Sequence, residues 1–441
     1  MSRSRLATRA VLSAGAVVVL AGGLLAAGAA FGGPTGSPAT QPAASAPAAA
    51  APDQLTTGIA KLQDQLRRVP QDDAAWAELG AGYVQQARVT ADPTLYAKAD
   101  GAFAESLRLR PDANDAALAG QASLAAARHE FAQAVELCDR ALAVNAYSAA
   151  ALAVKVDGLV ELGRYADSRT VLNRLLQLHP GIDAFSRASY ALELQGDVDG
   201  ARAALERALG VAQAPADRAF AQYYLGELAW NSGDVASAAR SYDAAVASDP
   251  AYVPPLTGRA KAEAARGDVE GALADYRAAV ARQPQPGTLV ELGELLEASG
   301  RTAEADQQYA VVRATQQLYA ASGQVVDAEL ALFEADHGEP AEAVRLAQRA
   351  HQARPRSIVA QDAYAWALHA AGRDREALPL ARAAVRTGLH SASLSYHLGV
   401  VEEAVGHVPA ARKALSRALE LNPTWNPLQA PKARTLLDSL S

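Results

Sequence analysis

Small and apolar side chains recur at constant distances after a series of glycines. The residue five places after each glycine is Ala or Ser, and the residue twelve places after is Ala, Leu or Val. A larger apolar residue often lies between them, at the ninth place. These distances put the side chains on one face of an α-helix. The glycines are Gly163, Gly196, Gly233, Gly267, Gly300, Gly338, Gly372 and Gly406. Their spacing of 33 to 38 residues predicts a repeat of about 34 residues that contains two helices.

The glycines and a set of prolines mark the expected helix ends. Glycine adopts a left-handed backbone conformation without steric cost, so we expect each glycine to end the first helix of its repeat. Proline cannot continue a helix, and it often follows the second helix of a repeat. These prolines are Pro111, Pro180, Pro250, Pro284, Pro355 and Pro423. The small residues between these ends allow adjacent helices to pack closely, and the larger residue fills the remaining gap.

On these positions the sequence resembles the tetratricopeptide repeat family. The eight-position pattern of that family is met, apart from one Ser, by Trp76, Leu79, Gly80, Tyr83, Ala99, Phe103, Ser106 and Pro111. A second repeat has His129 in place of the turn glycine. The resemblance implies an all-α fold, a right-handed α-solenoid of about ten helix-turn-helix repeats between residues 72 and 424. Helices at 55–69 and about 430–440 are expected to cap its two ends.

The N-terminus is different in kind from the repeats. Arg3, Arg5 and Arg9 precede an uncharged apolar stretch that runs to residue 33, as in an export signal. We interpret residues 1–33 as a transmembrane signal anchor or a cleaved signal peptide, with a buried helix as the third possibility. Residues 34–53 read as a Pro/Ala/Ser/Thr-rich linker, and 54–441 as the solenoid. The first two interpretations place the repeats outside the cytoplasm, held by a single anchor or secreted.

The resemblance also implies a concave groove formed by the first helix of each repeat. Its side chains are expected near the positions ten, six and three residues before each turn glycine. These positions and a few adjacent ones are occupied by Asp157, Glu161, Tyr190, Glu193, Phe220, Tyr223, Glu227, Trp230, Glu294, Glu297, Asp362, Trp366 and His369. Acids with interleaved aromatics suit a basic protein or peptide with apolar anchors. The competing interpretation is that the acids only face solvent and the aromatics only pack between repeats.

Composition narrows the classes of function. The net charge of −7 leaves no basic face for nucleic acid, and the single cysteine excludes internal disulfides. Cys138 is expected in the core. Six of the eight histidines lie after residue 336, but only His390 and His397 share a short spacing, so we expect exposed histidines and no metal site. No catalytic or cofactor-binding motif is present, so no cofactor is predicted and an enzyme is not expected.

The sequence therefore favours an extracytoplasmic scaffold that binds proteins in the membrane or cell envelope through its groove. One alternative is a helper in the maturation of exported proteins such as apocytochromes. Residues 66–84 are similar to a segment that begins the repeat domain of some bacterial cytochrome assembly factors. A metal-handling protein that uses the C-terminal histidines is a further alternative. The oligomeric state stays open, as does a division into two arrays near residues 313–323.

Overall fold

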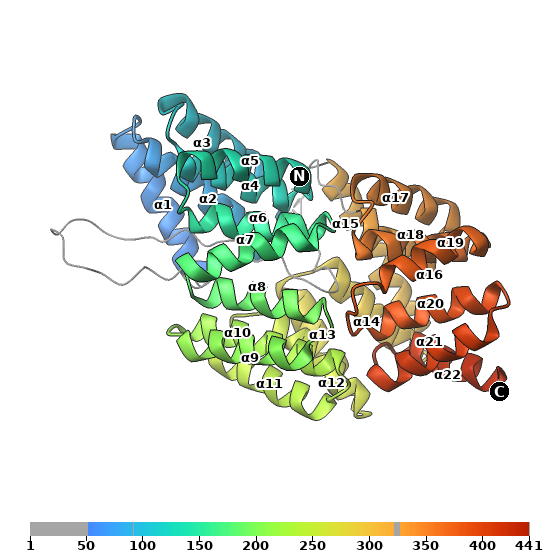
Figure 1. Cartoon of the computed structure of the whole chain (residues 1–441). Coiled ribbons are helices and arrows are strands. Elements are labelled where there is room, and N and C mark those ends of the chain that lie inside the picture. The colour runs from blue at the N-terminus through green and yellow to red at the C-terminus, as the bar shows by residue number, and fades with distance from the viewer. Residues whose placement is uncertain (1–51, 91, 322–326, 441) are drawn as a thin grey trace, which may run out of the picture.

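The computed structural model describes residues 52–90, 92–321 and 327–440, and these residues form 22 α-helices without a strand (Figure 1). The predicted anchor or signal (1–33) and nearly all of the predicted linker lie outside the described residues. Within the described part, none of the helices is both long enough and apolar enough to cross a membrane.

Twenty of the helices in the described residues form ten consecutive pairs, each a helix, a short turn and a second helix. The pairs are α2 (Asp73–Thr90) with α3 (Leu95–Leu109), α4 (Asp115–Ala127) with α5 (Phe131–Val144), α6 (Ala149–Glu161) with α7 (Tyr165–Leu178), α8 (Ile182–Glu193) with α9 (Val198–Val211), α10 (Pro215–Asn231) with α11 (Val235–Ser248), α12 (Pro254–Ala265) with α13 (Val269–Arg282), α14 (Pro286–Ala298) with α15 (Thr302–Ala321), α16 (Asp327–His337) with α17 (Pro340–Ala353), α18 (Ile358–Ala370) with α19 (Asp374–Ala384), and α20 (Ala392–Ala404) with α21 (Val408–Leu421). The predicted all-α solenoid of about ten repeats is confirmed.

The remaining two helices lie at the ends of the solenoid. α1 (Pro52–Arg68) packs on α2 through Leu55, Ile59, Leu62 and Leu66, all of which are buried. α22 (Gln429–Ser439) buries Ala433 against Leu415 and Ala418 of α21. A terminal repeat has no neighbour to cover its outer apolar face, so these helices shield that face from water.

The turn glycines adopt the expected backbone conformation at seven of eight positions. Their φ angles lie between 71° and 87°, in the left-handed region that glycine reaches without strain. Gly338 is the exception, and the expectation of a left-handed turn there was wrong. His129 takes the left-handed conformation in the repeat that lacks the glycine, with φ 63°.

Small residues at the predicted positions allow the close packing of the repeats. Ala201, Ala238 and Ala272 are completely buried, as expected for the fifth place after the glycine. The ring of Tyr242 fills the space beside two further glycines, Gly226 of α10 and Gly258 of α12. A Cβ atom at either glycine would overlap that ring. The Tyr242 ring therefore fits only because both neighbouring positions are glycines, which have no side chain.

The solenoid coils back on itself, so that its second half packs on its first. Four hydrogen bonds join residues 192 to 195 positions apart. They run from Gln283 Nε2 to Arg88 O, from Arg354 Nη1 to Glu161 Oε2, from Ile358 N to Tyr165 Oη, and from Asn422 Nδ2 to Trp230 O. A nearly constant separation means that one superhelical turn takes between five and six repeats. The described chain therefore completes two turns that lie in contact (Figure 1).

Three of the turn glycines are needed for this contact. A Cβ atom at Gly163 would overlap the backbone carbonyl of Arg356, one at Gly196 that of Gly388, and one at Gly233 that of Leu421. All three partner residues belong to the second superhelical turn. The same glycines that end helices thus also let the two turns approach each other.

Gly163→Ala and Gly372→Ala form a matched pair that separates these roles. Both glycines have φ 71°, but a Cβ atom at Gly372 meets nothing within 4 Å. Backbone strain alone costs about 1 kcal/mol, so Gly372→Ala should lower the thermal midpoint by a few degrees. Gly163→Ala should cost at least about twice as much, because the two turns must also separate. Equal midpoints for the two variants would contradict the packing of the turns.

Candidate functional site in the central cavity

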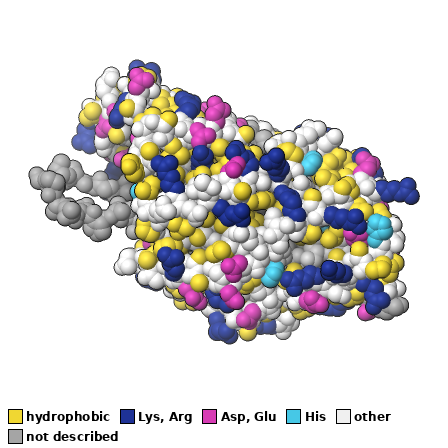
Figure 2. Space-filling model, viewed as in Figure 1, with side chains coloured by type: hydrophobic (Ala, Val, Ile, Leu, Met, Phe, Trp, Pro, Cys, Tyr) yellow, Lys and Arg dark blue, Asp and Glu magenta, His cyan; other side chains and the backbone are white. Residues whose placement is uncertain are grey.

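The first helices of the repeats line a central cavity of about 960 Å³. Its lining comes from helices as far apart as α2 and α22, and it continues across the junction of α15 and α16. Among the described residues, twelve carboxylates but only five Lys or Arg side chains line it, together with six tyrosines. The outer face in Figure 2 carries Lys and Arg spread among Asp and Glu. Acidic side chains thus outnumber basic ones on the inner wall.

The structure places ten of the thirteen predicted groove residues on this wall. The other three lie outside the lining and have partners of their own. Glu297 accepts a hydrogen bond from Tyr309 Oη at 3.0 Å, and His369 bonds Asp374 at 2.6 Å. Trp366 stacks on His397 with 4.1 Å between ring centroids. A role in ligand binding stays a prediction for the ten that line the cavity.

Five of the acids on the wall are paired with side chains of the next repeat, which differs from an exposed acidic surface. Polar pairs join successive first helices around the cavity. They are Asp157 with Arg187 (2.7 Å), Glu193 with Asn231 (3.1 Å), Glu227 with Lys261 (2.9 Å), Glu294 with His337 (3.3 Å), and Asp362 with His397 (2.9 Å). Each pair links one repeat to the next and satisfies groups that are costly to bury alone.

Burial nevertheless shifts the acids toward the protonated form. It raises the pKa of Glu161, Glu193 and Glu291 to about 7, and that of Asp157 to about 6. Arg354 counteracts the effect at Glu161, as Arg187 does at Asp157. A cation that entered the cavity would favour the ionised carboxylates, so the wall is suited to positively charged ligands.

One acid–base pair also joins the two superhelical turns. Glu161 of α6 and Arg354, just after α17, are separated by 2.8 Å and their side chains are 7% and 6% exposed. Arg354 also lies over the ring of Phe131 at 5.2 Å. A buried ion pair of this kind is strongly destabilised when one partner is removed, so it helps to hold the turns in register.

The segment between α21 and α22 enters the cavity and contacts the opposite wall. Asn426 Nδ2 donates to Glu294 Oε2 of α14 at 2.8 Å, and Asn422 Nδ2 donates to the Trp230 carbonyl of α10 at 2.8 Å. Trp425 of this segment also lines the cavity. The C-terminal end of the described chain therefore forms part of the site.

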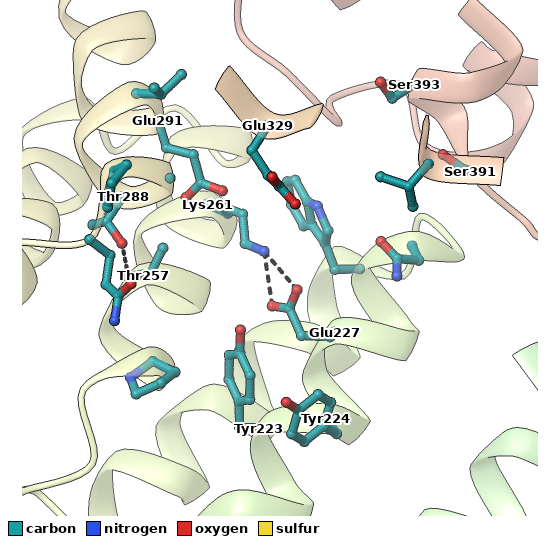
Figure 3. Close-up of a pocket in the computed structure, with 18 of the residues that line it drawn as sticks. Tyr223, Tyr224, Glu227, Thr257, Lys261, Thr288, Glu291, Glu329, Ser391 and Ser393 are labelled. Carbon is teal, nitrogen blue, oxygen red and sulfur yellow. Dashed lines mark hydrogen bonds and ion pairs between the residues drawn. The ribbon is translucent and has the colours of Figure 1, made fainter. Parts of the chain in front are cut away.

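Four side chains from four successive first helices converge at one place on the wall. We call Glu227 of α10, Lys261 of α12, Glu291 of α14 and Glu329 of α16 the carboxylate cluster. Figure 3 shows them pointing toward one another, with Tyr223 and Tyr224 nearby. Lys261 Nζ donates to both oxygens of Glu227, at 2.9 and 3.0 Å. Its single positive charge faces three carboxylates.

The other two acids of the carboxylate cluster retain hydrogen-bonding capacity. The Tyr276 hydroxyl hydrogen-bonds to Glu291, but Glu291 Oε2 is buried without a hydrogen-bond partner among the described residues. Both carboxylate oxygens of Glu329 are likewise buried, and neither has a partner within the described ranges. Gln285, at the start of α14, lines the same cavity; it is 8% exposed, and the described part of the chain offers its Oε1 no partner.

The C-terminal histidines do not behave as expected from the sequence. His397 is 2% exposed and pairs with Asp362, and His337 is half-buried between Glu294 and Tyr309, so the expectation of exposed histidines was wrong for both. No group of three or more His, Cys, Asp or Glu residues with metal-binding geometry occurs in the described ranges. The alternative of a metal-handling protein therefore gains no support from them. Cys138 is completely buried, as predicted.

The spacing rule could have found part of what the prediction missed. Applied to the repeat that ends at Gly267, it selects Thr257, Lys261 and Ala264, and all three line the cavity. Glu291 and Glu329 both lie nine places before a turn glycine, one residue from a groove position. Arg354 has no such signal, because its partner depends on the superhelical turn.

The tetratricopeptide repeat family matches residues 154–218, 188–253, 257–319 and 363–424. Together these ranges cover half of the chain. The chain belongs to the tetratricopeptide repeat family. Tetratricopeptide repeats typically form non-catalytic scaffolds for protein–protein interaction.

Two solved structures illustrate the similarity among tetratricopeptide repeat folds. The APC/C hetero-tetramer Cut9-Hcn1 aligns with 13% identity and a TM-score of 0.40, over 88% of this chain and 93% of that chain. A tetratricopeptide repeat protein from Parabacteroides merdae aligns with 19% identity and a TM-score of 0.33, over 59% and 98%. Both scores are low, and no partner is carried over from either. The search of curated proteins gave no match.

Glu193→Gln tests whether burial in the cavity favours the protonated form of the Glu193 carboxyl group. Because burial raises the pKa of Glu193 from 4.5 to about 7, the folded protein holds this proton more tightly than the unfolded chain. The resulting stability is present below about pH 4.5 and is lost as the pH rises through about 7. The variant should therefore be more stable than the parent at about pH 8, by about 1–3 kcal/mol, and similar at about pH 5.

Chemical unfolding at several pH values measures this difference, and Glu206→Gln provides the control because Glu206 is an exposed acid of α9. A Glu193→Gln variant that is destabilised at about pH 8 would show that the carboxylate is ionised and stabilising in the folded protein.

Proposed function

We propose that the chain binds a short, positively charged segment of a partner protein inside its central cavity. The observation that carries this proposal is the inner wall, where carboxylates outnumber Lys and Arg by twelve to five. Six tyrosines on the same wall offer apolar and aromatic contacts. A volume of about 960 Å³ suits a ligand of a few residues and is too small for a folded domain.

The partner would lie in the membrane or cell envelope. This part of the proposal rests on the sequence of residues 1–53, with its basic start, apolar stretch and Pro-rich linker. The linker would hold the repeat array, residues 54–441, at a distance from the membrane, on the outer side. Cleavage of the apolar segment would instead release the array as a secreted protein.

A peptide selection tests the binding mode. Random twelve-residue peptides displayed on phage would be selected against the full chain in detergent. We expect the selected peptides to be enriched in Lys and Arg, with aromatic residues between them, and to lose affinity as the salt concentration rises. The selection of acidic or uncharged peptides would contradict the proposal.

A pair of variants shows where the selected peptides bind. Glu193→Gln with Glu294→Gln removes two charges from the cavity wall, whereas Glu136→Gln with Glu206→Gln removes two from exposed helix faces. The first variant should weaken binding by about tenfold, and the second should leave it unchanged. Equal loss in both variants would indicate binding to the outer surface.

Protease accessibility tests the location. A tag fused after Ser441 should be cleaved by protease added to intact cells after the outer barriers are opened, while a cytoplasmic control protein stays protected. Protection of the tag under these conditions would place the repeats on the cytoplasmic side and contradict that part of the proposal.

A further inference from the structure

The carboxylate cluster has more acceptor atoms than donors. Three buried oxygen atoms of the cluster have no hydrogen-bond partner among the described residues: Glu291 Oε2 and both carboxylate oxygens of Glu329. The one cation in the cluster, Lys261, is already bonded to both oxygens of Glu227. Burial of unsatisfied acceptors is unfavourable. A ligand that supplies hydrogen-bond donors to these oxygens therefore gains more binding free energy than it would at a solvent-exposed surface.

The kind of donor follows from the number and type of these acceptors. An ammonium group has three N–H donors around one atom, whereas a guanidinium group has five in a planar fork that matches a carboxylate in a bidentate arrangement. A metal ion is a poor fit, because the described residues include no group of three or more ligands with suitable geometry. The aromatic rings of Tyr223 and Tyr224 lie beside Glu227 at one side of the cluster (Figure 3), and aromatic faces favour a flat cation.

We propose that the carboxylate cluster is a binding pocket for a guanidinium group, held by Glu291 and Glu329 beside the Lys261–Glu227 pair. This inference rests on the proposed function, because it identifies the pocket that would receive an arginine side chain of the bound segment. It gives the cavity a preference for arginine over lysine that net charge alone does not provide.

Titration of the cluster supports the same pocket. Burial raises the pKa of Glu291 to about 7, while Lys261 opposes the shift and Glu227 and Glu294 add to it. A guanidinium group requires the ionised form of Glu291. Its affinity should therefore rise several-fold between about pH 6 and about pH 8, whereas arginine itself does not titrate in this range.

Calorimetry with defined peptides tests the pocket. The probe is a blocked pentapeptide with the sequence Ala-Tyr-Arg-Tyr-Ala, titrated into the full chain in detergent. Matched peptides carry lysine or citrulline in place of arginine, and citrulline has the shape of arginine without its charge. We expect the arginine peptide to bind at least about tenfold more tightly than either.

Three variants locate the binding. Glu291→Gln with Glu329→Gln should weaken the arginine peptide about 30-fold, and the exterior pair Glu136→Gln with Glu206→Gln should leave it unchanged. Lys261→Met should tighten binding several-fold, because it removes a repelling cation and frees Glu227. Misfolding of this variant would lower the affinity, so an increase in affinity must come from the change in the pocket.

The outcomes separate this inference from the proposed function. If the arginine peptide binds the parent and the Glu291→Gln, Glu329→Gln variant equally well, the pocket is wrong while the cavity still binds basic segments. If none of the peptides binds but free L-arginine does, and the same variant abolishes that binding, the pocket stands and the protein-segment function fails. If neither peptide nor free arginine binds, both proposals fail.

Discussion

The contact between the two superhelical turns determines what the inner surface of this protein can do. Each bond in this contact joins residues 192 to 195 apart, so a single geometric period runs through the array. A tetratricopeptide groove that stays open presents its concave face to solvent. Here the turns lie against each other, and the concave face becomes the wall of a partly open central cavity. Its capacity is therefore limited to a short segment, and its charges act in a partly dry environment.

Burial of the cavity wall explains why many of its acids form pairs. A carboxylate that is removed from water loses hydration, and the raised pKa values of Glu161, Glu193 and Glu291 reflect that loss. Pairs such as Asp157–Arg187 and Glu227–Lys261 offset the loss and also tie successive repeats together. The carboxylate cluster is the place where pairing is incomplete. A structural role accounts for the paired acids, and a ligand accounts best for the unpaired ones.

The sequence predicts the repeats well because their signals are local. Small residues at positions such as Ala238 and Ala272 are required by contacts within one repeat or between neighbours, and glycines such as Gly372 by the local backbone conformation of the turn. The curvature of the array arises differently, from small rotations that accumulate over many repeats. The pairing of Arg354 with Glu161 could therefore not be predicted, and neither could the approach of Asn426 to Glu294. The inner position of Lys261 could have been, since it follows the same spacing as Glu227.

The central claim is that the two turns are in contact, and cross-linking tests it most directly. Arg164 and Arg356 are exposed residues next to the contact at Gly163, and the native Cys138 is buried. A chain with Arg164→Cys and Arg356→Cys should react with a short bis-maleimide to give an internally linked species. A pair at Arg164 and Arg240, two repeats apart in the same turn, should not. If the first pair stays unlinked in a chain that is fully helical and labelled at both cysteines, the turns are separate and the cavity is an open groove.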